Sequence, residues 1–198
     1  MTAKIKLNAA SGGGSFSLQA PSSSANNRVF TIPDVADGTI ATTATAGKIL
    51  QVVQNQTTTF ASNETTTMAD TNLSATITPT STSSKILVYI VQSTQIVMAT
   101  NIGGGFQLLR GSTVIHQAAP VSNGPIPVQL YFGNFASNAN FYFYHNMHKL
   151  DSPSTTSATT YKTQMALAIA GSSRSIRAQP TGDVTNGIST ITLFEVAA

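Results

Sequence analysis

The segment KLDSPSTTSATTYKTQMALAIA, residues Lys149–Ala170, decides how the rest of the chain is interpreted. Its first half is rich in Asp, Ser and Pro, which favour turns because Asp and Ser side chains bond nearby backbone and proline fixes φ. From Thr159 onward, larger side chains alternate with small or polar ones, the period-2 pattern of a half-buried strand. The inward positions of that strand would be Tyr161, Thr163, Met165, Leu167 and Ile169. The segment predicts a polar loop followed by a strand, with Tyr161, Met165 and Leu167 in the core.

The composition is that of an ordered domain with few charges. A length of 198 residues suits one sizeable domain, or one domain with a small appendage. Charged residues make up 9% of the chain, against roughly 25% in an average soluble domain. Hydrophobic residues make up 41% and the net charge is +3, so the chain lacks the low hydrophobicity and high charge of disordered sequences. We expect a packed core and a surface solvated mainly by hydroxyls and amides.

Several classes of partner and site are disfavoured by the same composition. The ten Lys and Arg residues are scattered among seven acids, so no basic track for nucleic acid is predicted. Cysteine is absent, which excludes disulfides and thiolate metal sites. No apolar run approaches the ~20 residues that span a bilayer, and the amino terminus lacks the apolar core of a signal peptide. We therefore expect no nucleic-acid partner, no membrane insertion, and folding in a cytoplasm.

Strand patterns recur along the whole chain, and no segment has a sustained helical period. Residues 1–47 contain short strands with few large apolar residues, so they can bury little alone. This predicts an N-terminal β-segment that is covered by the main domain or, the favoured interpretation, by copies of itself, as an interleaved trimer or packed on neighbouring subunits. Residues 48–198 contain longer strands separated by turns, which predicts an all-β antiparallel sandwich or jelly-roll-like head domain. Its most apolar run, Lys85–Met98, is predicted to be buried on both faces, and the glycines 103–105 to form a bend or a place of close backbone approach.

Residues 48–198 contain five short sequence segments in this order: KILQVVQ, ITPTSTSSKILVYI, GGFQLLRGSTVI, LDSPSTTSATTYKTQ and STITLFEVAA. Their order resembles a domain of tail-fibre-like proteins of aquatic and marine tailed bacteriophages. Residues 1–47 resemble the short β-repeat that precedes such heads, but the repeat occurs once here, which favours a compact tip, a short fibre or a small accessory protein. The resemblance implies a homotrimeric β-sandwich head located in the virion, with residues 1–47 as an N-terminal β-segment for trimerisation or virion attachment.

The resemblance implies a non-enzymatic virion structural protein, a tail fibre or receptor-binding protein that attaches to the host surface. Its expected partners are two further copies of itself, other virion proteins of the tail, baseplate or capsid, and a host cell-surface glycan. The alternative is a trimeric capsid decoration protein that stabilises the head. The candidate contact surfaces are the loops expected at one end of the sandwich, residues 120–127, 151–158 and 180–187, with no single residue preferred.

Histidines raise the question of a metal site. His145 and His148 are three positions apart, so on one strand their side chains point to opposite faces and cannot chelate one metal within a chain. No metal and no cofactor are expected. The one metal alternative is a ring of three His145 or three His148 side chains on the axis of a trimer.

The sequence predicts no pair of catalytic carboxylates. Glycoside cleavage needs two acids roughly 5–9.5 Å apart, and most acids here lie in turns, where Asp caps backbone. No G-x-S-x-G nucleophile elbow is present. We expect no catalytic residue. The seven acids of the chain are Asp34, Asp37, Glu64, Asp70, Asp151, Asp183 and Glu195.

Aromatic and arginine residues are the remaining candidates for recognition. Alternation predicts that most of the aromatic cluster faces the core, while its outward members either pack against a neighbouring subunit, the favoured interpretation, or stack on sugars. Arg174 and Arg177 would face opposite ways on a regular strand. If that segment curls, both could bind an acidic glycan, and an inter-subunit salt bridge is the other interpretation. The aromatic cluster comprises Tyr131, Phe132, Phe135, Phe141, Tyr142, Phe143 and Tyr144.

Overall fold

The chain divides into two compact units, Met1–Ala41 and Thr42–Ala198. The computed structural model describes residues 4–8, 11–13, 15–19, 48–98, 102–118, 130–132, 139–171, 173–182 and 185–198. The predicted domain boundary after residue 47, and the role of the N-terminal segment in trimerisation or attachment, stay predictions.

The first unit contains an antiparallel hairpin. Strands β1 (Lys4–Asn8) and β2 (Ser15–Gln19) pair with Ile5 opposite Leu18. Gly12 and Gly13 lie between them with φ of +85° and +70°, a conformation that glycine adopts without steric cost. The prediction of short strands in residues 1–47 is thus confirmed for β1 and β2, and residues 20–47 lie outside the described residues.

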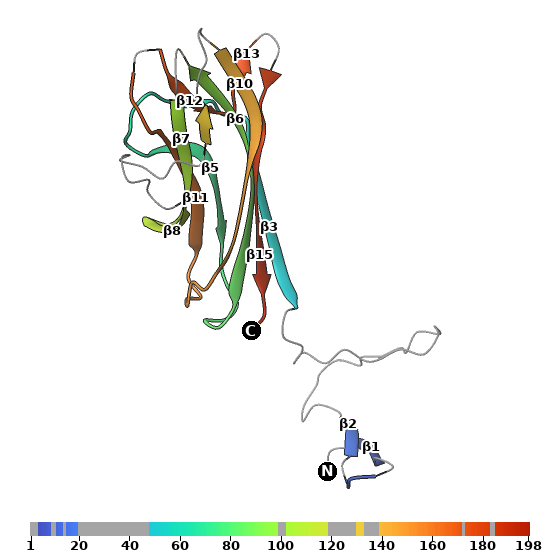
Figure 1. Cartoon of the computed structure of the whole chain (residues 1–198). Coiled ribbons are helices and arrows are strands. Elements are labelled where there is room, and N and C mark those ends of the chain that lie inside the picture. The colour runs from blue at the N-terminus through green and yellow to red at the C-terminus, as the bar shows by residue number, and fades with distance from the viewer. Residues whose placement is uncertain are drawn as a thin grey trace. The chain divides into compact units, whose positions relative to one another are not determined.

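The second unit is a β-sandwich of two antiparallel sheets, as predicted, and its described residues contain no helix (Figure 1). The first sheet, here the β6 sheet, contains β3 (Ile49–Thr57), β4 (Ala61–Asn63), β6 (Lys85–Met98), β10 (Ala139–Asp151), β12 (Ser175–Ala178) and β15 (Ser189–Val196). The second, here the β7 sheet, contains β5 (Ala69–Ile77), β7 (Ile102–Arg110), β8 (Thr113–Gln117), β9 (Leu130–Phe132) and β11 (Thr159–Leu167). Strands β13 (Thr181–Gly182) and β14 (Thr185–Asn186) pair with each other as a separate two-stranded sheet. In the described part of the chain, no helix is long and apolar enough to cross a membrane.

Strand β6 is the central strand of its sheet. One edge of β6 pairs with β15 along its first half and with β12 along its second half, and the other edge pairs with β10 along nearly its whole length. The prediction that β6 is buried on both faces is wrong for its first half. There Ile86, Val88 and Ile90 are buried while Tyr89 is 46% exposed, because only one face of the sheet covers the core.

The core lies between the two sheets and consists mainly of aliphatic side chains from β5, β6, β7, β11 and β15. Tyr161, Met165 and Leu167 are all fully buried, which confirms the alternation of β11. Ile169, predicted on the same face, is 49% exposed because β11 ends at Leu167.

The glycines 103–105 lie inside β7 and do not form a bend. Close backbone approach is confirmed at Gly104, where an added Cβ would lie 3.1 Å from the carbonyl oxygen of Ala166 and 3.2 Å from Ile176 Cδ1. Gly111 and Ser112 form the turn that joins β7 and β8 in an antiparallel hairpin.

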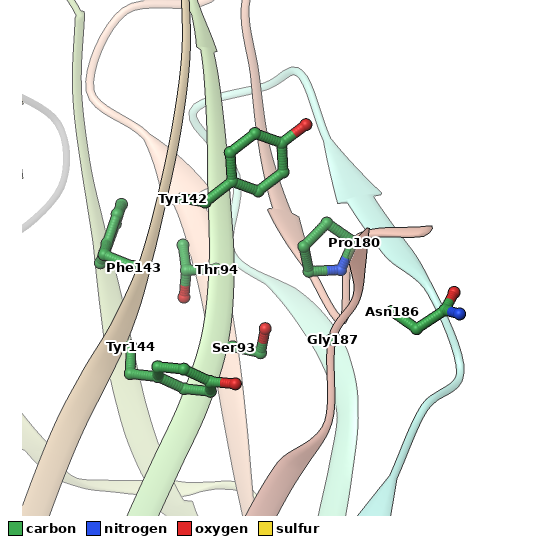
Figure 2. Close-up of a pocket in the computed structure, with 8 residues that line it drawn as sticks. All are labelled: Ser93, Thr94, Tyr142, Phe143, Tyr144, Pro180, Asn186 and Gly187. Carbon is green, nitrogen blue, oxygen red and sulfur yellow. The ribbon is translucent and has the colours of Figure 1, made fainter. Parts of the chain in front are cut away.

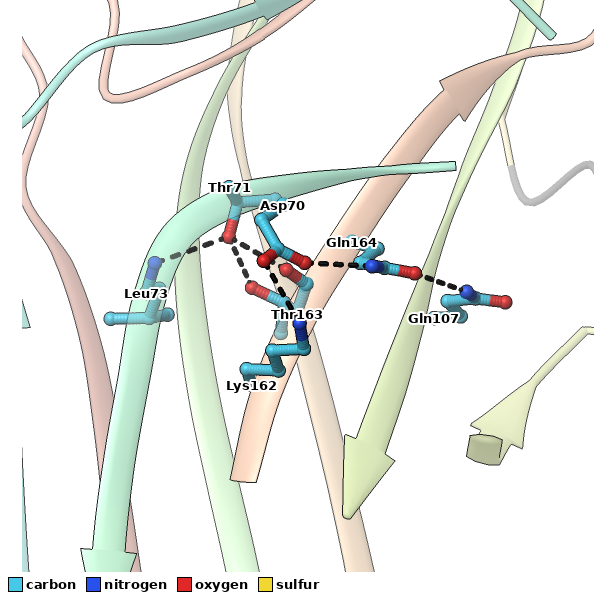
Figure 3. Close-up of polar contacts among 7 residues, drawn as sticks. All are labelled: Asp70, Thr71, Leu73, Gln107, Lys162, Thr163 and Gln164. Atoms are coloured by element: carbon cyan, nitrogen blue, oxygen red, sulfur yellow. Dashed lines mark hydrogen bonds and ion pairs between the residues drawn. The ribbon is translucent and has the colours of Figure 1, made fainter. Parts of the chain in front are cut away.

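A polar seam, defined by Thr71, Gln92, Thr163 and Ser189, crosses the core from one sheet to the other. The Thr71 hydroxyl contacts that of Thr163, as Figure 3 shows. The Thr163 hydroxyl donates to Gln92 Oε1 at 3.0 Å, and Gln92 Nε2 donates to Ser189 Oγ at 2.7 Å. All four residues are buried, so these bonds satisfy groups that would otherwise be costly to bury.

At the surface of the β7 sheet, a row of polar side chains runs across three strands (Figure 3). Gln107 Nε2 donates to Gln164 Oε1 at 2.6 Å, and Gln164 Nε2 donates to Asp70 Oδ1 at 2.7 Å. Lys162 completes the row with an ion pair of 2.8 Å to Asp70. Burial acts to raise the pKa of Asp70, but the bonds from Lys162 and Gln164 outweigh it and lower the pKa.

A second ion pair closes the base of the loop after β10. Arg110 Nη1 lies 2.9 Å from Asp151 Oδ2, and the buried Tyr161 hydroxyl donates to the same oxygen at 2.8 Å. Burial, and then the bond to the carboxylate, raise the pKa of Tyr161. The idea that most acids are backbone caps is wrong for Asp151 and Asp70, since the bonds they accept come from side chains.

Glu195 joins the end of β15 to the loop between β5 and β6. Its carboxylate accepts from Gln51 Nε2 at 2.6 Å and from the Thr80 backbone and hydroxyl, each at 2.7 Å. Burial acts to raise its pKa, but the bonds from Gln51, Ser84 and Thr80 outweigh burial and bring the pKa to about 2. Neutral donors thus hold a buried carboxylate in its charged form.

Asp151→Asn should destabilise the head by about 1–3 kcal/mol, because it leaves Arg110 and the buried Tyr161 hydroxyl without their charged partner. The matched control is Asp70→Asn, whose ion pair is half exposed and should contribute less than about 1 kcal/mol. Denaturant unfolding of both variants measures the difference. Equal losses would contradict the assigned role of Asp151.

Glu195→Gln should lower stability at neutral pH by about 1–3 kcal/mol. The folded pKa of about 2 lies below the ordinary value of 4.5, so the carboxylate contributes its full stabilisation above pH 4.5 and loses it as the pH falls toward 2. The gap between wild type and variant should therefore narrow over that window in thermal unfolding scans. A gap that stayed constant down to pH 2 would refute this role.

Candidate binding site

Two of the three predicted contact loops, 151–158 and 180–187, lie at different ends of the sandwich. The loop at 151–158 follows the pairing of Asp151 with Ile86, near the start of β6. The loop at 180–187 follows Gln179, whose backbone N–H donates to Ser93 in the second half of β6. Figure 1 places them at opposite ends of the unit. The loop at 120–127 lies outside the described residues.

The outer face of the β6 sheet carries a ridge of three polar side chains at the end where β12 joins it. Tyr142, Gln95 and Arg177 lie side by side on β10, β6 and β12. Gln95 Nε2 donates to the Tyr142 hydroxyl at 2.9 Å, and Arg177 Nη1 donates to Gln95 Oε1 at 3.4 Å. We call these three residues the Gln95 ridge, and a hollow lies on each side of it.

The first hollow, the tyrosine groove, has a volume of about 320 Å³. Figure 2 shows Tyr142 and Tyr144 from β10 on one side, and Pro180 and Asn186 on the other. The tyrosines are 47% and 63% exposed, unusually high for aromatic rings. Exposed ring faces beside hydroxyl and amide groups suit a ligand with both apolar faces and hydroxyl groups, such as a sugar. The full lining is Ser93, Thr94, Tyr142, Phe143, Tyr144, Pro180, Asn186 and Gly187.

One wall of the tyrosine groove depends on Gly187. Its N–H donates to the Pro180 carbonyl at 2.9 Å, and this bond joins the two ends of the segment 180–187 beside Ser93. A Cβ added at Gly187 would meet the Ser93 hydroxyl and lie 2.7 Å from Pro180 Cδ and 3.1 Å from Gln179 Cα. Only glycine therefore fits at this position without a shift of the wall.

Gln179 ties the same wall to the polar seam of the core. It is buried, with φ of +47°. In the amide orientation that satisfies its neighbours, its nitrogen donates to the carbonyls of Thr71 and Thr59, each at 2.9 Å. Its oxygen accepts from Ser189 Oγ and Gln92 Nε2, each at 2.7 Å. The groove wall is thus anchored in the interior.

The second hollow, the arginine pocket, has a volume of about 240 Å³. Arg174 and Arg177 both line it. Of the two predicted arrangements, the one in which both side chains share a surface holds, because Arg174 precedes β12 and strand alternation does not fix its direction. The full lining is Glu64, Val97, Ala139, Asn140, Ser173, Arg174, Ser175 and Arg177.

The aromatic cluster divides by face. Phe141 and Phe143 are partly buried and pack against the core, whereas Tyr142 and Tyr144 point outward. This is the predicted alternation, with the two tyrosines as its outward members. Nothing is described of the side chains of Tyr131 and Phe132, and Phe135 lies outside the described residues.

The two candidate histidines point to opposite faces of β10, as predicted. His145 points inward and stacks on Phe106 with ring centroids 4.8 Å apart, while His148 is exposed. Burial, with a smaller contribution from His116, lowers the pKa of His145. The described residues contain no group of three or more His, Asp or Glu side chains placed to hold a metal. A ring of His148 side chains on a trimer axis stays a prediction.

The described acids have separate surroundings. Glu64 lines the arginine pocket, while Asp70, Asp151 and Glu195 bond the partners given above. Asp34, Asp37 and Asp183 lie outside the described residues.

Known proteins resemble this chain only weakly, in sequence and in structure. The chain matches no protein-family model and no curated protein. One solved structure, of infectious bursal virus-derived T=1 particles, matches at 12% identity with a TM-score of 0.32, covering 92% of this chain and 45% of that one. A second, of infectious bursal disease virus strain Gx, matches at 12% identity and a TM-score of 0.30, covering 94% of this chain and 46% of that one. This chain therefore spans under half the length of either, and likeness this weak carries no argument about function.

Gly187→Ala should destabilise the head by about 1–3 kcal/mol, because the new methyl group overpacks the wall against Pro180 and Gln179. Gly171→Ala is the matched control, since its nearest neighbours are atoms of the Arg174 side chain, which can move. Chemical denaturation measures both. If Gly187→Ala cost no more than the control, the close packing of the wall would be disproved.

Proposed function

We propose that the chain is a virion structural protein of a tailed bacteriophage, a tail fibre or receptor-binding protein that attaches to a glycan on the host surface. The observation that carries this proposal is the tyrosine groove. Two exposed tyrosine rings on the β6 sheet lie beside the hydroxyl and amide groups that complete the lining. The resemblance of the five ordered segments to fibre heads supports such a role, and so does the low content of charged residues.

Attachment through a shallow groove calls for several copies. A groove of this size buries only a few sugar rings, so each site would be weak, and three linked sites would gain avidity. We propose a homotrimer for this reason, in agreement with the resemblance to trimeric fibre heads.

An apolar row on the outer face of the β6 sheet is the surface proposed to join the copies. Val52, Phe194, Leu87 and Leu150 lie opposite one another across β3, β15, β6 and β10. Val52 is 54% exposed and Leu150 49% exposed. Burying such a row against a second copy would remove apolar area from water. It lies near the start of β6, away from the tyrosine groove, so one face could serve both contacts.

The same apolar row keeps a second candidate function open. A capsid decoration protein must also bury an apolar patch, against coat subunits in place of its own copies. In that case the tyrosine groove would be covered by coat protein or have no ligand.

Antibody against residues 48–198, bound to intact particles and viewed by electron microscopy, separates the two functions. A tail fibre should be labelled at the tail, and the purified chain should compete with particles for host cells. Label spread over the head, without competition, would replace attachment by decoration. Light scattering at micromolar concentration should give three times the chain mass, and a monomer would remove the trimer.

A further inference from the structure

Two buried polar atoms at the arginine pocket have no hydrogen-bond partner. They are Ser175 Oγ and Arg177 Nε. Ser175 is 2% exposed, and both residues line the pocket. Buried donors without partners are rare in folded proteins because each loses its bonds to water and gains none. Two of them at one hollow indicate that the pocket receives an acceptor from outside the chain.

The guanidinium of Arg177 is held in one orientation. Its Nη1 donates to Gln95 Oε1 at 3.4 Å, and its Cζ lies 6.0 Å from the centre of the Phe60 ring. These contacts use one end and one face of the group, and they leave the Nε edge without a partner. That edge presents parallel N–H groups that match the two oxygens of a carboxylate or two oxygens of a sulfate.

The charge of the pocket favours an anion. Arg174 and Arg177 contribute two positive charges to the lining, and Glu64 contributes one negative charge. In the part of the chain that the structure describes, the ion pairs join Arg110 to Asp151 and Lys162 to Asp70, so Arg177 belongs to neither. Glu64 is exposed, so water weakens its repulsion of an incoming anion.

We propose that the arginine pocket binds the negatively charged oxygen group, a carboxylate or sulfate, of an acidic sugar. Ser175 Oγ and Arg177 Nε donate to its oxygens, and Arg174 adds positive charge. The Gln95 ridge connects this pocket to the tyrosine groove, where Tyr142 borders the neutral neighbour of the acidic sugar. The anion pocket itself stands on its own geometry, while its use in host attachment rests on the proposed function.

The test is a titration of the purified chain followed by nuclear magnetic resonance of its backbone amides and arginine Nε–H groups. The probes are sodium glucuronate, sodium sulfate and neutral glucose, all at constant ionic strength. Glucuronate should shift the Arg177 Nε–H and Ser175 amide signals saturably, and glucose alone should not. If sulfate shifts these signals as strongly as glucuronate does, the pocket recognises the charged oxygen group and not the sugar ring. No saturable shift with either anion would overturn the proposal and leave a bound water as the missing partner.

One variant is expected to weaken anion binding and another to strengthen it, so that loss of the site can be distinguished from misfolding. Arg177→Gln should weaken glucuronate binding about tenfold or more, because it removes a charged donor. Glu64→Gln, at an exposed position, should strengthen binding about two- to fivefold by removing repulsion. The matched control is Lys85→Gln, which removes one positive charge at the other end of β6 and should have no effect. Equal weakening by Lys85→Gln, or no gain from Glu64→Gln, would contradict the pocket. If the wild-type chain binds the anion but particles that carry Arg177→Gln still attach to the host normally, the pocket stands and only its role in attachment is contradicted.

Discussion

The structure depends on the pairing of β6 with three strands at once. Its first half is fixed between β15 and β10, and its second half between β12 and β10. A slip of one residue would exchange the two faces of β6, moving Gln95 into the core and Ile96 to the surface. The aliphatic core on one face and the Gln95 ridge on the other therefore have a common origin in one register.

The proposed recognition surface is coupled to the interior through the polar seam. Gln92 on β6 bonds Thr163 across the core and Ser189 beside it, and Gln179 joins the same group from the groove wall. Closed networks of buried polar groups hold one arrangement firmly, because breaking any bond leaves a buried group unpaired. A binding face supported in this way needs little ordering when a ligand arrives, which favours affinity from a small contact.

Local patterns in the sequence predicted the strands well, and they failed where distant segments meet. Alternation placed Tyr161 and Met165 in the core, and spacing placed His145 and His148 on opposite faces. The same rules could not find the Gln95 ridge, because its three members come from strands far apart in the chain. They also put the loops at 151–158 and 180–187 together, although the pairing of β6 separates them. The pairing of Asp151 with Arg110 was likewise invisible, since only the fold brings β10 and β7 together.

Binding of the purified head to cells of the host bacterium tests the central claim that the outer face of the β6 sheet recognises the host. The informative comparison pairs Tyr144→Ser with Arg177→Gln in one variant, and Thr155→Ala with Thr156→Ala in another, in the loop after β10. We expect the first variant to lose binding while the second retains it. Binding lost through the loop and retained without Tyr144 and Arg177 would contradict the account and move the contact to the opposite end of the sandwich.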